Sequence, residues 1–200
     1  MALNSYYRRE QFPITIVRPS LTYDTVIPVP IGGWAEYTIV DRIRNGKKII
    51  VHGDGTSLFT ITHADDFAKG FLGLLGHQQS IGESFHITSD EILTWNQIHQ
   101  ALADAVGCEP VIVHIPSEIL ATRDEDLRGS LIGDKATSTI FDNTKIKRFV
   151  PGFTATIPFK QGIHRTITWF ESDPARKIVQ KETNAWMDKI IDQQEKTFNL

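Results

Sequence analysis

The sequence predicts an α/β protein whose strands form a largely parallel sheet. Short apolar runs rich in β-branched residues alternate with amphipathic segments of helical period from residue 14 to residue 116. This alternation is typical of an α/β sheet, because a helical bundle would lack the strands and a β-sandwich would lack the helices. The sequence shows no internal repeat and no low-complexity tract.

Five strands and three helices are expected in this first part. The strands cover residues 14–19, 47–53, 58–62, 83–89 and 110–116. The helices cover residues 34–46, 63–76 and 94–107. The run at 14–19 is continuously β-branched until Arg18, so we expect a strand that is buried on both faces. Gly46 is expected to end the first helix, and Gly53, Asp54 and Gly55 to form a tight turn between two strands.

The pattern is weaker after residue 116. We expect a helical piece and an irregular loop over 117–135, a short helix at 143–149 and a longer helix at 159–171. The tail from residue 174 is expected to be a surface helix, because it spaces a few apolar residues among charges. These apolar residues are Ile178, Trp186, Ile190 and Ile191. We therefore divide the chain into a domain at 1–173 and a C-terminal surface helix at 174–200.

Composition limits the classes of protein to consider. The chain has 200 residues, of which 40% are hydrophobic and 22% charged, enough for one sizeable core. The 21 basic and 24 acidic residues give a net charge of −3 without a basic block, so no nucleic-acid partner is predicted. The single cysteine, Cys108, excludes an internal disulfide framework and fits a reducing, cytoplasmic location. No apolar run approaches the roughly 20 residues of a membrane span, so no membrane partner is predicted.

Three glycines have the spacing of a dinucleotide-binding loop. Gly70, Gly73 and Gly76 follow a G-x-x-G-x-x-G pattern. A loop that holds a pyrophosphate must follow a strand and open a helix. These glycines instead lie within a helix that Asp65 or Asp66 is expected to cap. We therefore expect Gly70 and Gly73 to allow close packing and Gly76 to end the helix.

Two segments resemble a known family. Residues 17–23 read VRPSLTY, and residues 53–66 read GDGTSLFTITHADD. Both resemble segments of the extended short-chain dehydrogenase/reductases, the NAD-dependent epimerase/dehydratase family, in its C-terminal, substrate-side part. The later segments 141–153 and 159–170 resemble that family's closing elements, so the resemblance covers roughly residues 6–172. It implies the C-terminal portion of a Rossmann-like doubly wound sheet with a small substrate-binding region.

The family's cofactor and proton-transfer residues are absent from this sequence. The family uses NAD or NADP, held by a Gly-rich loop, and a Tyr-x-x-x-Lys pair whose lysine lowers the phenol pKa. No tyrosine here has a lysine four places on. The resemblance thus implies that residues 1–11 start within a connecting helix and that the chain is part of a longer enzyme. We expect the chain alone to be inactive and to bind no cofactor.

The resemblance also assigns candidate site residues. It implies that Pro19, Ser20 and Leu21 lie beside the nicotinamide end of the cofactor. It implies contact with the substrate for Tyr23, Phe59 and His63, and Trp34 is expected to close the pocket from its position behind the Gly32–Gly33 turn. Structural roles remain open for several of them: a strand terminator at Pro19, a core aromatic residue at Trp34 and a helix-start residue at His63.

Departures from the family pattern bear on the substrate. Ser57, Phe59 and Thr60 stand where nucleotide-sugar enzymes of the family have Gln, Arg and Asp. A phenylalanine cannot neutralise a diphosphate, so a nucleotide-diphosphate sugar is disfavoured and a small carbonyl or alcohol compound is predicted. Asp66 is interpreted as a helix cap rather than a catalytic acid. The histidines show no metal-ligand pairing, so no metal is predicted.

Two alternatives to an enzyme part remain. The chain is either a non-catalytic binding or regulatory protein derived from the same fold, or a module that pairs with a second copy. A homo-oligomer is expected because half of a parallel sheet leaves an open edge and apolar surface.

Overall fold

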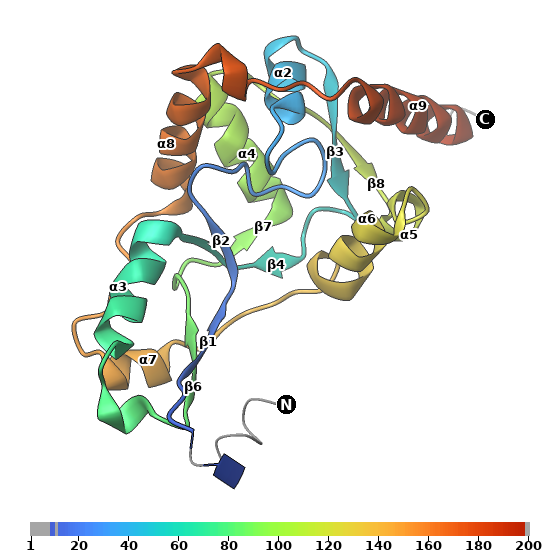
Figure 1. The fold of residues 1–200 in the computed structure, drawn as a ribbon. Helices are drawn as coiled ribbons and strands as arrows, with labels where there is room; N and C mark the ends of the chain where they lie inside the picture. The colour runs from blue at the N-terminus through green and yellow to red at the C-terminus, as the bar shows by residue number, and fades with distance from the viewer. Residues whose placement is uncertain (1–8, 11, 199–200) are drawn as a thin grey trace.

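The computed structural model describes residues 9–10 and 12–198 (Figure 1). The connecting helix predicted for residues 1–11 lies largely outside these residues. Three pairs of strands are parallel: β1 (Ile16–Pro19) with β6 (Ser84–Ile87), β2 (Leu21–Tyr23) with β5 (Ile61–His63), and β3 (Lys48–His52) with β8 (Val111–Ile115). Partners lie far apart in sequence and are joined through helices, which confirms the predicted α/β class with parallel pairing.

The first predicted strand is less buried than its sequence suggests. The run at 14–19 becomes β1 followed at once by β2, and in β1 Arg18 and Pro19 are exposed. Among the described residues, β1 has β6 as its one partner strand, so its other edge is open. The expected burial on both faces is therefore wrong. Self-association through this edge stays a prediction.

The strand predicted at 58–62 is two strands. β4 (Leu58–Phe59) pairs antiparallel with β7 (Leu93–Thr94), whereas β5 pairs with β2. The chain changes partner at Thr60, which a pattern of alternating polarity does not reveal. The turn through Gly53–Gly55 lies between β3 and β4 as predicted, with the Gly55 N–H donating to the His52 carbonyl at 3.2 Å.

The two central helices are confirmed. α3 covers Ala64–Leu74, and α4 covers Trp95–Val106 behind a capping box formed by Thr94 and Gln97. A Cβ added to Gly70 would lie 2.6 Å from the Ile87 side chain, and one added to Gly73 would lie 2.4 Å from the Val150 side chain. Both positions therefore require glycine for close packing. Gly76, just beyond the helix, has a φ of 72°, so all three predicted glycine roles are confirmed.

The segment 117–135 is more helical than predicted. It contains α5 (Ser117–Leu120), α6 (Glu125–Ser130) and a five-residue π-helical turn at Leu131–Lys135, called the π-turn below. Asp124 caps α6 by accepting a hydrogen bond from the Leu127 N–H at 2.7 Å. Leu127 and Leu131 are buried in a cluster that the C-terminal helix completes. The irregular loop expected here is therefore wrong.

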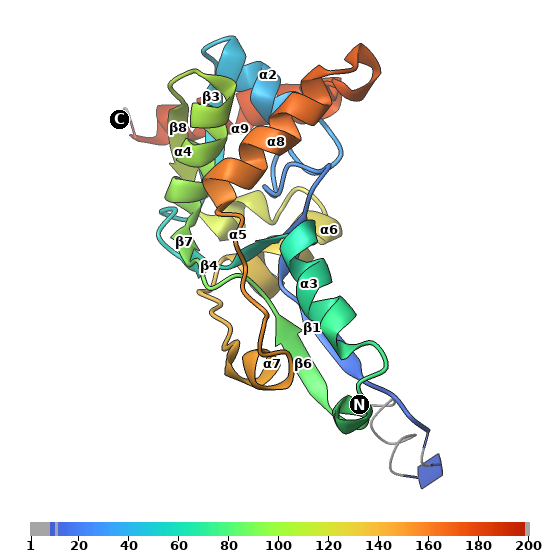
Figure 2. The ribbon, with the colours of Figure 1, turned by 90° about the vertical axis from the view of Figure 1, so that its left-hand side faces the viewer.

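The remaining helices close the two ends of the molecule. α7 (Thr144–Phe149) and α8 (Phe159–Glu171) match the prediction, and short 3₁₀ turns occur at Gln78–Ser80 and Pro174–Arg176. Figure 2 shows α8 lying along α4 at one end of the molecule, while α3 and α7 flank β6 at the other. Between these ends, Trp95 and Phe59 belong to the largest core cluster.

The C-terminal helix is fixed to the body through β3, through the buried cluster that holds Leu127 and Leu131, and through Arg42 of α2 (Thr38–Arg44). α9 (Lys181–Phe198) buries Met187 and Ile191 and packs beside β3. Trp186 and Ile190 pack partly buried on the same cluster as predicted, whereas Ile178 precedes the helix and is half exposed. The division of the chain at residue 174 stays a prediction.

One buried arginine makes a polar connection to α9. Arg42 on α2 is 1% exposed, and its Nε donates to the Lys48 carbonyl at 2.8 Å. Its Nη2 donates to Asp188 at 2.7 Å, and its Nη1 donates to both oxygens of Asn184. The guanidinium thus links α2, β3 and α9.

No helix among the described residues is both long enough and apolar enough to span a membrane. The same residues contain no group of three or more His, Cys, Asp or Glu side chains arranged to hold a metal ion.

Candidate functional site

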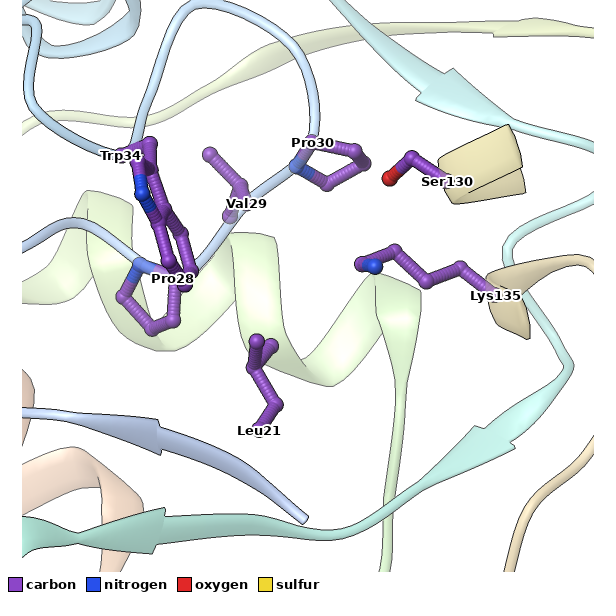
Figure 3. Close-up of a pocket in the computed structure, with 7 residues that line it drawn as sticks. All are labelled: Leu21, Pro28, Val29, Pro30, Trp34, Ser130 and Lys135. Carbon is purple, nitrogen blue, oxygen red and sulfur yellow. The ribbon is translucent and has the colours of Figure 1, made fainter. Parts of the chain in front are cut away.

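A pocket of about 220 Å³ lies just past the carboxyl end of β1 (Figure 3). Its walls come from the start of β2, from the loop at residues 27–34, called the Trp34 loop below, and from the ends of α6 and of the π-turn. The lining residues are Leu21, Pro28, Val29, Pro30, Trp34, Ser130 and Lys135. Ligands of open α/β sheets bind in the crevice outside the carboxyl ends of the strands, so the position suits a ligand site.

The Trp34 loop has an unusual backbone. Trp34 has a φ of 60° and forms an isolated antiparallel bridge with Ile27, so it lies in a loop four residues before α2. The prediction that a helix starts at Trp34 is therefore wrong. A Cβ on Gly33 would lie 2.4 Å from the Val29 side chain, which shows how tightly the loop folds on itself. The fold leaves Trp34 half exposed at the pocket rim.

Lys135 enters the pocket from the opposite wall (Figure 3). Its backbone carbonyl accepts hydrogen bonds from Trp95 Nε1 at 3.1 Å, His52 Nε2 at 3.2 Å and Ser57 Oγ at 3.2 Å. Its side chain is 13% exposed, and its ammonium lies 3.0 Å from the carboxylate of Asp134. The π-turn therefore has a fixed backbone from which one cation projects inward, and such turns recur at functional sites.

Two of the three groups that hold Lys135, His52 and Trp95, are neutral and buried. Burial lowers the pKa of His52 to about 4, which outweighs the opposing effect of its hydrogen bond to the Lys135 carbonyl. At neutral pH the imidazole is therefore uncharged, and its Nε2 carries the proton that the carbonyl accepts. Nδ1 of His52 has no hydrogen-bond partner among the described residues. Trp95 is fully buried and lies across the imidazole with ring centroids 4.8 Å apart.

The predicted cofactor neighbours have different positions. Leu21 lines the pocket, whereas Pro19 is exposed at the end of β1. The hydroxyl of Ser20 is hydrogen-bonded to that of Thr62 at 3.0 Å, which ties the chain to β5. Contact with a cofactor stays a prediction for all three residues.

Of the four predicted substrate residues, Trp34 lines the pocket, whereas the other three are buried and do not line it. The Tyr23 hydroxyl donates to the Phe159 carbonyl at 3.3 Å, and burial raises the pKa of this phenol far above its usual value. The Tyr23 ring meets the His63 ring edge-on at 5.3 Å between centroids. Phe59 packs against Trp95 at 5.1 Å between ring centroids. Substrate contact by Tyr23, Phe59 and His63 stays a prediction.

The start of α3 differs in detail from the prediction. His63, rather than Asp65 or Asp66, is the N-cap residue, and its Nδ1 accepts a hydrogen bond from the Asp65 N–H at 3.2 Å. The structural role considered for His63 is therefore present.

Asp66 is buried and has a role other than capping. Its carboxylate accepts hydrogen bonds from the Ile157 N–H at 2.8 Å and from Lys69 Nζ at 2.6 Å. Burial alone would raise the pKa of Asp66, but these donors outweigh it and hold the pKa below its usual range. Asp66 thus fixes the chain that leads into α8, and its interpretation as a helix cap is wrong.

Comparison with known proteins places this geometry in context. No family model matches the chain. The chain is 21% identical over 178 residues to the human dTDP-D-glucose 4,6-dehydratase. The matched region covers 86% of this chain and 45% of that protein. The crystal structure of dTDP-glucose 4,6-dehydratase from Bacillus anthracis, in complex with NAD, superposes with a TM-score of 0.64 at 21% identity. That match covers 88% of this chain and 50% of the other.

The chain shares the fold of the NAD-dependent epimerases and dehydratases. This confirms the Rossmann-like class, and the sequence similarity to a dehydratase agrees with the resemblance drawn from residues 17–23 and 53–66. A third relative, the chloroplast stem-loop binding protein of 41 kDa b from Arabidopsis thaliana, is 31% identical over 101 residues, covering 50% of this chain and 26% of that protein. The chain thus spans between a quarter and a half of the length of these curated relatives.

The described residues do not fit a whole NAD molecule. The glycine triplet of α3 offers no cradle for a pyrophosphate, because the side chains of Ile87 and Val150 fill the space beside Gly70 and Gly73. The pocket itself has one cation and mostly apolar walls.

Several residues of the pocket are absent from the predicted set. Pro28, Val29 and Pro30 stand in a Pro-rich stretch that the sequence marks as a loop but not as a site. Ser130 and Lys135 have no local signal, because contacts with residues far away in the sequence place them.

Proposed function

We propose that the chain is the substrate-side part of an NAD(P)-dependent epimerase, dehydratase or reductase, and that the pocket between Trp34 and Lys135 holds a small carbonyl or alcohol compound. The observation that carries the proposal is the pocket itself. It joins an apolar wall, made by Leu21, Pro28 and Trp34, to a polar end at Ser130 and Lys135. Sites for small organic compounds have this combination of apolar surface and a few polar groups.

The size and charge of the pocket support a small substrate over a nucleotide-diphosphate sugar. Recognition of a diphosphate favours arginine, whose planar fork makes paired charged hydrogen bonds. Phe59 stands at the position of the family's arginine and is buried in the core. Among the seven described residues that line the pocket, Lys135 is the one charged side chain.

We expect this chain to supply binding rather than proton transfer. The sequence has no Tyr-x-x-x-Lys pair. Tyr23, the one tyrosine among the candidate site residues, donates a hydrogen bond from its hydroxyl to the Phe159 carbonyl within the core. Because burial also raises its pKa, this phenol stays protonated at neutral pH and cannot act as a base.

Binding of neutral aromatic alcohols and ketones tests the pocket. Titration with 1-phenylethanol or acetophenone should shift the NMR signals of Leu21, Val29, Trp34 and Lys135. Trp34→Ala should weaken binding by about tenfold, because the ligand loses an aromatic face. Phe71→Ala, which removes an exposed aromatic side chain on α3, is the matched control and should leave binding unchanged. NAD should bind this chain more weakly than about 1 mM by calorimetry.

NMR shifts that spread over the protein surface would contradict the placement of the site. Equal losses of binding in Trp34→Ala and Phe71→Ala would contradict it as well. Micromolar NAD binding to this chain would contradict the proposal that it binds the substrate while other residues hold the cofactor.

A non-catalytic binding protein is the second candidate, favoured by the 31% identity to the stem-loop binding protein. The net charge of −3 argues against an RNA-binding version of it. We expect no gel shift of a stem-loop RNA at about 0.15 M salt with up to tens of micromolar protein. Micromolar binding that weakens steeply with salt would favour this second candidate over the first.

A further inference from the structure

Two side chains reach into the pocket from opposite walls, and each is fixed by its backbone (Figure 3). Trp34 stands on the left-handed residue of the Trp34 loop, a conformation that a tryptophan rarely adopts. Residues in such conformations persist where the surrounding structure holds them and are concentrated at ligand clamps. Here the bridge to Ile27 and the close packing of Gly33 on Val29 supply that support.

Lys135 supplies a positive charge that the pocket walls do not balance. Its side chain is 13% exposed, while its carboxylate partner Asp134 is 48% exposed and does not line the pocket. Among the described residues, the ammonium therefore has Asp134 as its one ion-pair partner, on its solvent side, and faces mostly apolar residues on the pocket side. A negative group in the pocket would meet a partly desolvated cation, with the Ser130 hydroxyl in the same wall as a second hydrogen-bond donor.

We propose that the compound held in this pocket carries one carboxylate, which pairs with Lys135, and an apolar or aromatic body, which packs against Trp34. The substrate class is then a small hydroxy acid or keto acid. The inference rests on the proposed function of the pocket and narrows it.

The donor set favours a carboxylate over a phosphate. A phosphate monoester carries a charge of about −1.5 to −2 at neutral pH and three strong acceptor oxygens. The pocket offers one ammonium and one hydroxyl, and Asp134 already neutralises part of that single charge. The single negative charge of one carboxylate matches the positive charge and the donors that remain.

A matched pair of ligands tests the charge. Mandelate and mandelamide share an aromatic ring and a hydroxyl group, but mandelate carries an ionised carboxylate where mandelamide carries a neutral amide. Mandelate should bind about tenfold more tightly than mandelamide by calorimetry, since its carboxylate forms a charge-assisted pair. Phenyl phosphate should bind no more tightly than mandelate.

Variants at Lys135 locate the effect. Lys135→Met keeps the apolar stem and should bring the two dissociation constants within about twofold, while Lys135→Arg should keep the preference for mandelate. Lys47→Met, which removes an exposed charge outside the pocket, should leave the ratio unchanged. Since Lys135 is half-buried, circular dichroism must first show that Lys135→Met is folded. If it is not, the ratio in Lys135→Gln decides.

The outcomes separate this inference from the proposed function. If mandelate and mandelamide bind equally and Trp34→Ala weakens both, the inferred carboxylate pairing is overturned, but the pocket still stands as a binding site. A preference for mandelate that survives Lys135→Met would also overturn it. Binding of neither ligand, nor of 1-phenylethanol, would overturn the proposed function as well.

Discussion

Replacing Arg42 with methionine is expected to lower the free energy of unfolding by about 2–4 kcal/mol and to loosen α9. Methionine keeps much of the apolar stem but removes every donor of the guanidinium. The carbonyl groups of Lys48 and Asn184 would then lose a charged partner. Hydrogen bonds from charged groups contribute roughly 1.5–3 kcal/mol. Asp188 is 53% exposed, so water replaces most of the interaction that its carboxylate loses with the guanidinium.

Urea denaturation measures the change in stability, and hydrogen exchange of the amides in 181–198 measures the loosening of α9. Arg44→Met is the control: Arg44 is 43% exposed, pairs with Glu171, and should contribute less than about 1 kcal/mol. Equal effects of the two variants, or unchanged exchange in α9, would show that Arg42 does not fasten the helix.

The expected loosening extends to the pocket. Met187 and Ile191 of α9 share a buried cluster with Leu127 and Leu131, which lie beneath the walls that present Ser130 and Lys135. We therefore expect Arg42→Met to weaken ligand binding as well, although Arg42 does not line the pocket.

Local signals in the sequence predicted the elements whose form depends on near neighbours. α4 is an example, because Thr94 and Gln97 form its capping box within four residues. Burial was predicted less well. The apolar run of β1 indicated a strand with two buried faces, but burial depends on which strands lie beside it, and β6 is its one partner among the described residues. Leu127 and Leu131 became part of a helical segment because α9, about sixty residues later, covers them.

The same distinction applies to the candidate site. The family resemblance led to Leu21, and the place of Trp34 behind the Gly32–Gly33 turn led to that residue. Both do line the pocket. The resemblance could not lead to Lys135, because hydrogen bonds from three separate segments place that residue: Ser57 precedes β4, His52 ends β3 and Trp95 begins α4. The conformation of Trp34 was also hidden, since a helical pattern of residues continues through it while its pairing with Ile27 sets a positive φ.

Acid is expected to destabilise the protein between about pH 6.5 and pH 4 through two buried histidines. Burial lowers the pKa of His52 and of His99 to about 4 from 6.5. In this interval the unfolded chain binds protons that the folded protein does not, so stability falls as the pH falls. The contribution is complete above pH 6.5 and is lost at about pH 4. Each histidine accounts for a loss on the order of 3 kcal/mol.

Urea denaturation between pH 7.5 and pH 4.5 tests this expectation, with His52→Gln and His99→Gln each removing one titrating group. Each variant should reduce the slope of stability against pH, whereas His164→Gln, at an exposed position, should not. An unchanged slope in His52→Gln and His99→Gln would contradict it. The carboxylates with lowered pKa, such as Asp66 and Asp90, affect stability mainly below this pH interval.

His52 and His99 both contact Trp95, and His52 and Trp95 hold the Lys135 carbonyl. Ligand binding should therefore be lost together with stability as the pH falls, and mandelate present in excess should shift the acid midpoint to lower pH.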